Sequence, residues 1–194
     1  MSVSRERVVE KYAKAELGFW LYLMTDIILF ASLFATYMVL RPNIAGGMSS
    51  SELFDPTFAL AETVLLLMSS FTCGLAVLFL RFRYKSTGLT LLAVTLLLGG
   101  MFLFLEMYEF MEFIHEGQSW QTSGFLSGFF ALVATHGLHI TIGILWGLVL
   151  FWYIFKKGIT ANAMRRVSLF SLFWHFLDIV WIFIFTIVYL GAFV

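Results

Sequence analysis

Five long apolar stretches follow one another along the chain, with only short polar segments between them. A span needs about 20 apolar residues to cross roughly 30 Å of hydrocarbon. The pattern therefore predicts five transmembrane spans near residues 18–40, 58–80, 88–110, 124–155 and 168–193. Backbone groups in lipid must pair within the protein, and continuous apolar runs do not fit alternating barrel strands, so each span is expected to be a helix. The overlong fourth stretch is expected to tilt or to leave the bilayer at its ends.

Composition supports an all-α membrane protein with a bundle of five transmembrane helices. Hydrophobic residues make up 61% of the 194 positions and charged residues only 12%, whereas a typical soluble domain has about 25% charge. A soluble helical bundle would also need a polar face on each helix, and the spans lack one. Residues 1–17 mix both charge signs without an apolar core, so we expect a cytoplasmic segment rather than a signal peptide. Residues 18–194 are then a single membrane domain.

The distribution of Lys and Arg predicts the orientation. Of these 12 residues, 11 lie before the first span or in the loops after the second and fourth spans, and only Arg41 lies on the other side. Lys and Arg are enriched in cytoplasmic loops. The N-terminus is therefore expected in the cytoplasm and the C-terminus outside, on the periplasmic side. Because the basic residues carry this orientation signal, they give no support for nucleic-acid binding.

Ionisable residues inside the spans are the candidate functional residues, because such groups are costly in hydrocarbon and usually pair with one another. With a rise of 1.5 Å per residue, five of them fall in one layer about 8–15 Å from the cytoplasmic face. This buried polar cluster consists of Asp26, His136, His139, His175 and Asp178. A second layer of carboxylates, near the outer face, consists of Glu62, Glu106 and Glu109.

The favoured interpretation of the inner layer is an inter-helix hydrogen-bond cluster, in which Asp26 and Asp178 accept from imidazoles. A metal site is an alternative, but a di-iron centre wants Glu-x-x-His pairs on two helices with further carboxylates. The chain offers His-x-x-His, His-x-x-Asp and Glu-x-x-Glu instead. A proton relay through Asp26 and haem binding by one of the histidines also remain open.

Small residues predict where helices touch. Gly124 and Gly128 are four residues apart, as are Gly143 and Gly147, and the third span contains Gly99–Gly100. Glycines at such spacing let helix backbones approach closely in lipid.

Four segments resemble one known family. They are GFWLYLMTDIILFASLFAT (residues 18–36), LEMYEFME (105–112), SGFFALVATHGLHITIG (127–143) and FWHFLDIVWIFIFTIVY (173–189). The His-Gly-x-His and Trp-His-Phe-x-Asp-x-Val-Trp patterns are the most specific. In this order the segments resemble subunit III of the haem-copper terminal oxidases and cover nearly the whole chain.

The resemblance also indicates a branch of that family. Mitochondrial-type subunit III has seven helices, and the chain lacks the first two, as is typical of bacterial quinol oxidases and of some bacterial cytochrome c oxidases. Residues 45–74 look most like the cytochrome bo-type ubiquinol oxidase branch, with the menaquinol oxidases nearly as similar. The buried carboxylate of the first span, often Glu in the mitochondrial type, is Asp26 here.

The resemblance implies a non-catalytic subunit of a proton-pumping quinol oxidase in a bacterial inner membrane. It implies no catalytic or metal-ligating residue in this chain, with haem and copper in partner subunit I. Subunits I, II and IV are the expected partners, and the expected roles are stabilising subunit I, binding phospholipid and supporting proton uptake. The rivals are subunit III of a cytochrome c oxidase, a stand-alone membrane di-metal enzyme and a small proton channel. Basic residues at the cytoplasmic level attract anionic headgroups, so we expect a bound phospholipid near Lys156, Lys157 or Arg165.

Overall fold

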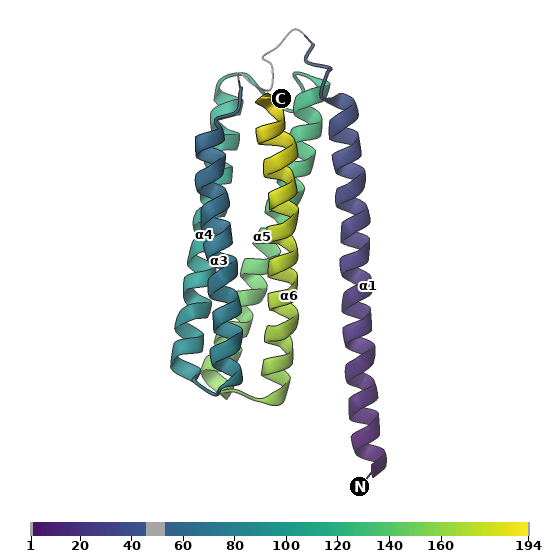
Figure 1. Ribbon diagram of the computed structural model, residues 1–194, viewed down its shortest axis with the longest axis vertical. Helices are drawn as coiled ribbons and strands as arrows, with labels where there is room; N and C mark the ends of the chain where they lie inside the picture. Colours follow the sequence, from purple (N-terminus) through teal and green to yellow (C-terminus); the bar gives the residue numbers. More distant parts are fainter. Residues whose placement is uncertain (1, 46–52, 194) are drawn as a thin grey trace.

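The computed structural model describes residues 2–45 and 53–193, with side chains from residue 13 onward. These residues form five long helices and short connecting turns (Figure 1). The helices are α1 (Ser2–Leu40), α3 (Pro56–Arg81), α4 (Lys85–His115), α5 (Gly124–Lys157) and α6 (Ala161–Ile184). A π-helical turn, η1 (Phe185–Tyr189), and a 3₁₀ turn, η2 (Leu190–Phe193), continue the direction of α6. All five helices are long and apolar enough to cross a membrane, which confirms the predicted all-α class.

Four helices form a closed bundle and the fifth packs on its side. Each of α3, α4, α5 and α6 contacts two neighbours, in the order α3–α4–α5–α6–α3. Helix α1 lies against α5 and, less extensively, against α6, and its N-terminal end projects beyond the bundle (Figure 1). With five helices running up and down, the two chain ends lie at opposite ends of the molecule.

Polar side chains cap the N-termini of three helices, α3, α5 and α6, and fix where these helices begin. Asp55 caps α3 by accepting from the Thr57 backbone N–H at 2.8 Å, and Pro56 occupies the first turn, where its missing N–H costs nothing. Ser123 caps α5 by accepting from Leu126 N–H, and Thr160 caps α6 by accepting from Ala163 N–H, both at 3.1 Å.

The connection between α3 and α4 is only three residues long. It contains Arg83 in the left-handed region, with φ of 67°. Arg83 donates to the Ile159 carbonyl at 2.7 Å, and Lys85 donates to the Phe155 carbonyl at 3.0 Å. These two bonds tie the α3–α4 turn to the α5–α6 turn at the same end of the bundle.

Glycines allow large aromatic side chains to enter the bundle. A Cβ at Gly143 would lie 2.9 Å from the Trp174 ring, and one at Gly147 would overlap with the Leu96 side chain. Gly128 makes the predicted close approach to a helix backbone, since a Cβ there would lie 3.3 Å from the Cα of Tyr37 on α1, whereas Gly124 faces the side chain of Asn43 in the turn after α1. The prediction for Gly100 is wrong. Gly100 has nothing within 4 Å of the position of a Cβ, because it faces outward while its neighbour Gly99 faces inward.

Candidate functional site: polar residues inside the helix bundle

Asp26 of α1 and His139 of α5 form the polar contact between these two helices. Their Oδ2 and Nε2 atoms are 3.7 Å apart, and Asp26 is buried. The Nδ1 atom of His139 lies 2.7 Å from the Thr135 carbonyl, which can only accept, so Nδ1 carries a proton. The imidazole is thereby held with Nε2 directed at the carboxylate. At 3.7 Å the two atoms are within ion-pair range but beyond hydrogen-bond distance, and Asp26 Oδ2 has no hydrogen-bond partner among the described residues.

His175 and Asp178 lie elsewhere, at the contact between α6 and α3. The Nδ1 atom of His175 lies 2.6 Å from the Ser171 carbonyl, and a Cβ at Gly74 would lie 3.8 Å from its Nε2 atom. Asp178 is buried beside the Ser70 hydroxyl and close to His175. This pair therefore contributes polar groups to the α3–α6 interface, separately from Asp26 and His139.

His136 occupies a third environment, inside a cage of aromatic rings. It is fully buried and stacks on Trp181 with ring centroids 5.3 Å apart, while Phe102 meets its ring edge-on at 5.9 Å. Neither ring nitrogen has a hydrogen-bond partner among the described residues. The five residues that the sequence assigns to one layer are thus divided among three places around the bundle.

The carboxylates of the other layer are more deeply buried than those of the inner layer. Glu62 and Glu106 have no exposed surface, and Glu109 is 5% exposed. The Tyr189 hydroxyl donates to Glu109 Oε2 at 2.6 Å. Glu106 lies against α5, where a Cβ at Gly137 would be 2.7 Å from its Oε1 atom. Gly137 therefore makes room for this carboxyl group between α4 and α5.

Two tryptophans of α6 make hydrogen bonds that the sequence did not reveal. Trp174 Nε1 donates to the Ser69 hydroxyl at 2.9 Å, and Trp181 Nε1 donates to the Thr63 hydroxyl at 3.0 Å. Both indoles are fully buried, where an N–H needs a partner. The sequence did contain one signal for these bonds. The two tryptophans are seven residues apart, which is about two helical turns, and the hydroxyl residues Thr63 and Ser69 on α3 have a similar spacing of six.

The described side chains provide no ligand set for a metal ion. No three His, Cys, Asp or Glu side chains among them converge in a way that could hold an ion. Cys73, the single cysteine, is buried.

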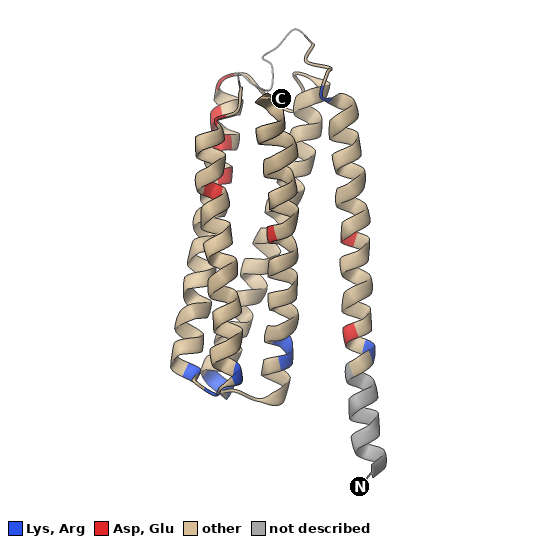
Figure 2. Cartoon of the chain, viewed as in Figure 1, with Lys and Arg blue, Asp and Glu red and all other residues tan. Residues whose placement is uncertain are grey.

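Charge separates the two ends of the molecule (Figure 2). One end, called the basic end here, carries Lys14, Arg81, Arg83, Lys85, Lys156, Lys157, Arg165 and Arg166, whereas the carboxylates of α4 gather toward the other end. Lys156 lies over the Trp152 ring at 4.9 Å, and Lys157 lies over the Tyr153 ring at 5.4 Å. Arg165 pairs with Glu16 of α1 at 3.3 Å.

The fold and these polar contacts define a polytopic helical membrane protein whose ionisable groups lie at helix–helix contacts. The sequence profile described as cytochrome c oxidase subunit III matches residues 5–193. The chain therefore belongs to the cytochrome c oxidase subunit III family.

Individual relatives agree with this assignment. Cytochrome bo(3) ubiquinol oxidase subunit 3 of Pseudomonas putida is 56% identical over 174 residues, which cover 90% of this chain and 84% of the relative. Quinol oxidase subunit 3 of Bacillus spizizenii is 49% identical over 175 residues, covering 90% of this chain and 85% of the relative. Cytochrome c oxidase subunit 3 of Bacillus sp. (strain PS3) is 46% identical, with 90% and 84% covered.

Proposed function

We propose that the chain is the non-catalytic subunit III of a terminal quinol oxidase, which couples quinol oxidation to oxygen reduction in aerobic respiration. The main support for this proposal is that the chain is 56% identical to a ubiquinol oxidase subunit 3 over 90% of its length. The arrangement of the polar residues supports a structural rather than a catalytic role, because Asp26, Glu109 and the two indoles each bridge different helices.

The same proposal includes the partners and the place in the cell. Subunit I, with its haems and copper, subunit II and subunit IV are the proposed partners, in a bacterial plasma membrane. Many large apolar side chains on α1 and α5 are exposed, including Ile28, Val39, Leu145 and Val149, and they offer surface for lipid or for such partners. The basic end is proposed to face the cytoplasm, in accord with the positive-inside rule.

Phospholipid binding near Lys156, Lys157 or Arg165 is a further part of the proposal. In support, the ammonium groups of Lys156 and Lys157 lie over the rings of Trp152 and Tyr153 at the end of α5, and such amphipathic rings are enriched at membrane–water interfaces. Such a site would hold an anionic headgroup beside α5. The bound lipid would slow the inactivation of subunit I during turnover.

The competing function is subunit III of a cytochrome c oxidase, which the 46% identity to the Bacillus sp. protein favours. Purification of the tagged chain from its native membrane separates the two. A co-purifying subunit II without a copper pair, together with quinol oxidase activity, is expected. A copper-pair signal with cytochrome c oxidase activity would replace the proposal by its competitor. Recovery of the chain without any oxidase subunit would contradict both.

A further inference from the structure

Three glutamates from two helices lie together toward the end of the bundle opposite the basic end (Figure 2). Glu62 of α3 is close enough to Glu106 and Glu109 of α4 for their charges to interact. Tyr189 of η1 joins them from a third element, since its hydroxyl donates to Glu109 Oε2 at 2.6 Å. These four residues are called the carboxyl cluster here.

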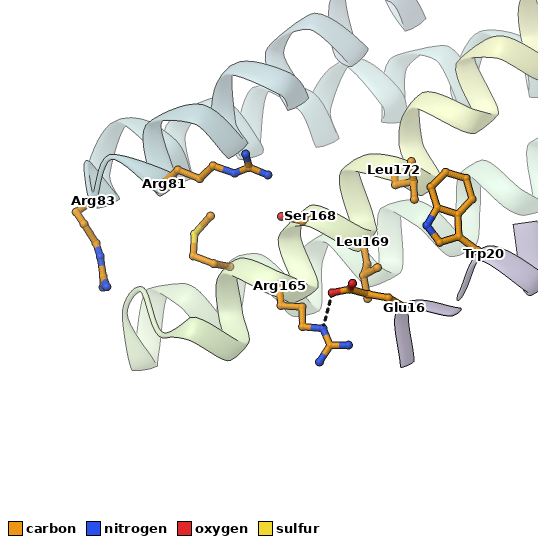
Figure 3. Close-up of a pocket in the computed structure, with 9 residues that line it drawn as sticks. Glu16, Trp20, Arg81, Arg83, Arg165, Ser168, Leu169 and Leu172 are labelled. Carbon is orange, nitrogen blue, oxygen red and sulfur yellow. Dashed lines mark ion pairs between the residues drawn. The ribbon is translucent and has the colours of Figure 1, made fainter. Parts of the chain in front are cut away.

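No cation balances the carboxyl cluster among the described residues. Arg41 is the one Lys or Arg of the sequence at this end, and its guanidinium donates to the Gly191 carbonyl. Neither ion pair between described side chains involves the cluster. The pair of Glu16 and Arg165 lies at the basic end (Figure 3), and the other pair joins α1 to α5. The cluster therefore has to limit its negative charge in another way.

Burial determines how the charge is limited. Glu62 and Glu106 have no exposed surface, and all four of their carboxyl oxygens lack a hydrogen-bond partner among the described residues. An unpaired carboxylate is very costly in an apolar interior, and two carboxylates that share a site are not both ionised. A carboxylate can only accept, whereas a carboxylic acid also carries one O–H donor. Because the Tyr189 hydroxyl is already engaged by Glu109, protons on the two buried acids are the donors that remain.

A series of acids leads from this buried pair to the surface. Asp55 and Glu112 are exposed, and both are close enough to Glu109 for their charges to interact. Glu109 is 5% exposed, and it interacts on its other side with the fully buried Glu62 and Glu106. Glu109 therefore connects the buried pair with acids that water reaches.

We infer that the carboxyl cluster is a proton-binding site, in which Glu62 and Glu106 are protonated and exchange protons with the aqueous phase through Glu109. The two O–H groups bond within the cluster, directly or through an ordered water. In each exchange, a proton passes from an inner carboxylic acid to the Glu109 carboxylate and from there to water. A proton from water then returns by the same path, so the charge of the cluster is the same before and after. A metal cation is the competing way to neutralise the acids.

Infrared spectroscopy of the purified oxidase tests the protonation, because a carboxylic acid has a C=O stretching band that a carboxylate lacks. At neutral pH the wild type is expected to show such a band, which moves when the protein contains ¹³C-labelled glutamate. Glu62→Gln and Glu106→Gln should each lose one carboxyl group's share of the band and still assemble, because the amide is close in shape to the acid. The matched control is Glu116→Gln, at an exposed position directly after α4, which should leave the band unchanged.

Transfer to D₂O tests the exchange route. The wild-type band should shift as deuterons replace the protons of Glu62 and Glu106. Glu109→Gln keeps an acceptor for Tyr189 but cannot carry the proton, so the shift should be lost on the time scale of wild-type exchange. Glu116→Gln should exchange as fast as the wild type.

Several results would overturn the inference. One is a wild-type spectrum without a carboxylic acid band that responds to Glu62→Gln or Glu106→Gln. Another is equally fast exchange in the wild type and Glu109→Gln. A stoichiometric divalent cation that is lost in Glu62→Gln would show that a metal, rather than protons, neutralises the acids. The inference does not depend on the proposed function, since quinol oxidase activity of the same wild-type preparation is measured separately.

Discussion

The indole of Trp174 lies directly over Gly99, so closely that a Cβ at this glycine would be 2.6 Å from Cζ2 of the ring. Gly143 borders the same ring from α5. One tryptophan of α6 therefore fills the space that two glycines leave on α4 and α5, and its Nε1 atom reaches Ser69 on α3. All four helices of the bundle meet around this side chain.

Substitution of Gly99 tests this packing. Gly99→Ala should lower the free energy of unfolding in detergent by about 1–3 kcal/mol, because the added methyl group overpacks the Trp174 site. Gly100→Ala is the matched control, since nothing lies within 4 Å of its Cβ position. The control should be neutral or slightly stabilising, given the higher helix propensity of Ala. Equal thermal denaturation of the two variants would contradict the packing described here.

Removal of the Tyr189 hydroxyl tests the bond to Glu109. Tyr189→Phe should destabilise the protein by about 1–3 kcal/mol, because a buried carboxyl group loses its donor. Tyr108→Phe, at an exposed position on the same helix as Glu109, should have little effect. In combination with Glu109→Gln, the Tyr189→Phe variant should show strong non-additivity in a double-mutant cycle. Additive effects would mean that the two groups are not coupled.

Loss of the Asp26 carboxylate should speed the inactivation of the oxidase during turnover more than it lowers the initial rate of oxygen consumption. Asp26→Ala removes the carboxylate 3.7 Å from His139 and loosens α1 on α5. The assembled oxidase is therefore expected to start near the wild-type rate of oxygen consumption and to inactivate faster during turnover. His136→Ala should behave similarly, because it opens a cavity under Trp181. Nearly complete loss of initial activity in either fully assembled variant would indicate a direct catalytic role instead.

Metal analysis of the purified chain tests the di-metal alternative. We expect no transition metal in stoichiometric amount, because no three His, Cys, Asp or Glu side chains converge among the described side chains and His136 lies in an aromatic cage. The measurement is elemental mass spectrometry after removal of the other subunits. The result that would support the di-metal enzyme is a stoichiometric metal in the wild type that is lost in both His136→Ala and His139→Ala.

The orientation can be tested by labelling, since the only cysteine, Cys73, is buried. Gln118→Cys lies in the turn after α4, and Lys156→Cys lies at the basic end. A membrane-impermeant maleimide should label Gln118→Cys in spheroplasts, in which the outer membrane has been removed and the inner membrane is still sealed. Lys156→Cys should react only after the cells are opened. The reverse pattern would place the basic end outside.

The five spans and the burial of their acids could be predicted from sequence for one physical reason. Lipid requires a helix wherever the chain is apolar over the bilayer thickness, and the rise per residue then gives depth. Asp26, Glu62 and Glu106, which the sequence places inside apolar spans, are all buried in the bundle, as expected of ionisable groups in such segments.

Rotation about each helix axis could not be predicted in the same way. Both faces of these helices are apolar, so the sequence carries little signal for which face turns inward. For this reason Gly100 was expected in a contact and faces outward, while Asp178 lies beside Ser70 rather than near Asp26. The indole hydrogen bonds of Trp174 and Trp181 depend on the same rotation, together with the register of α6 against α3.

The short turn at Arg83 has a consequence for biogenesis. Because only three residues join α3 to α4, these two helices can leave the translocon together as one hairpin. Within that hairpin Ser69 donates to the Thr95 carbonyl at 3.1 Å, and the Thr72 and Thr95 hydroxyls are 2.9 Å apart. The hairpin thus satisfies these hydroxyl groups before any later helix is synthesised. The segment from α6 to η1 then adds three hydrogen bonds to this hairpin, from Trp174 to Ser69, from Trp181 to Thr63 and from Tyr189 to Glu109.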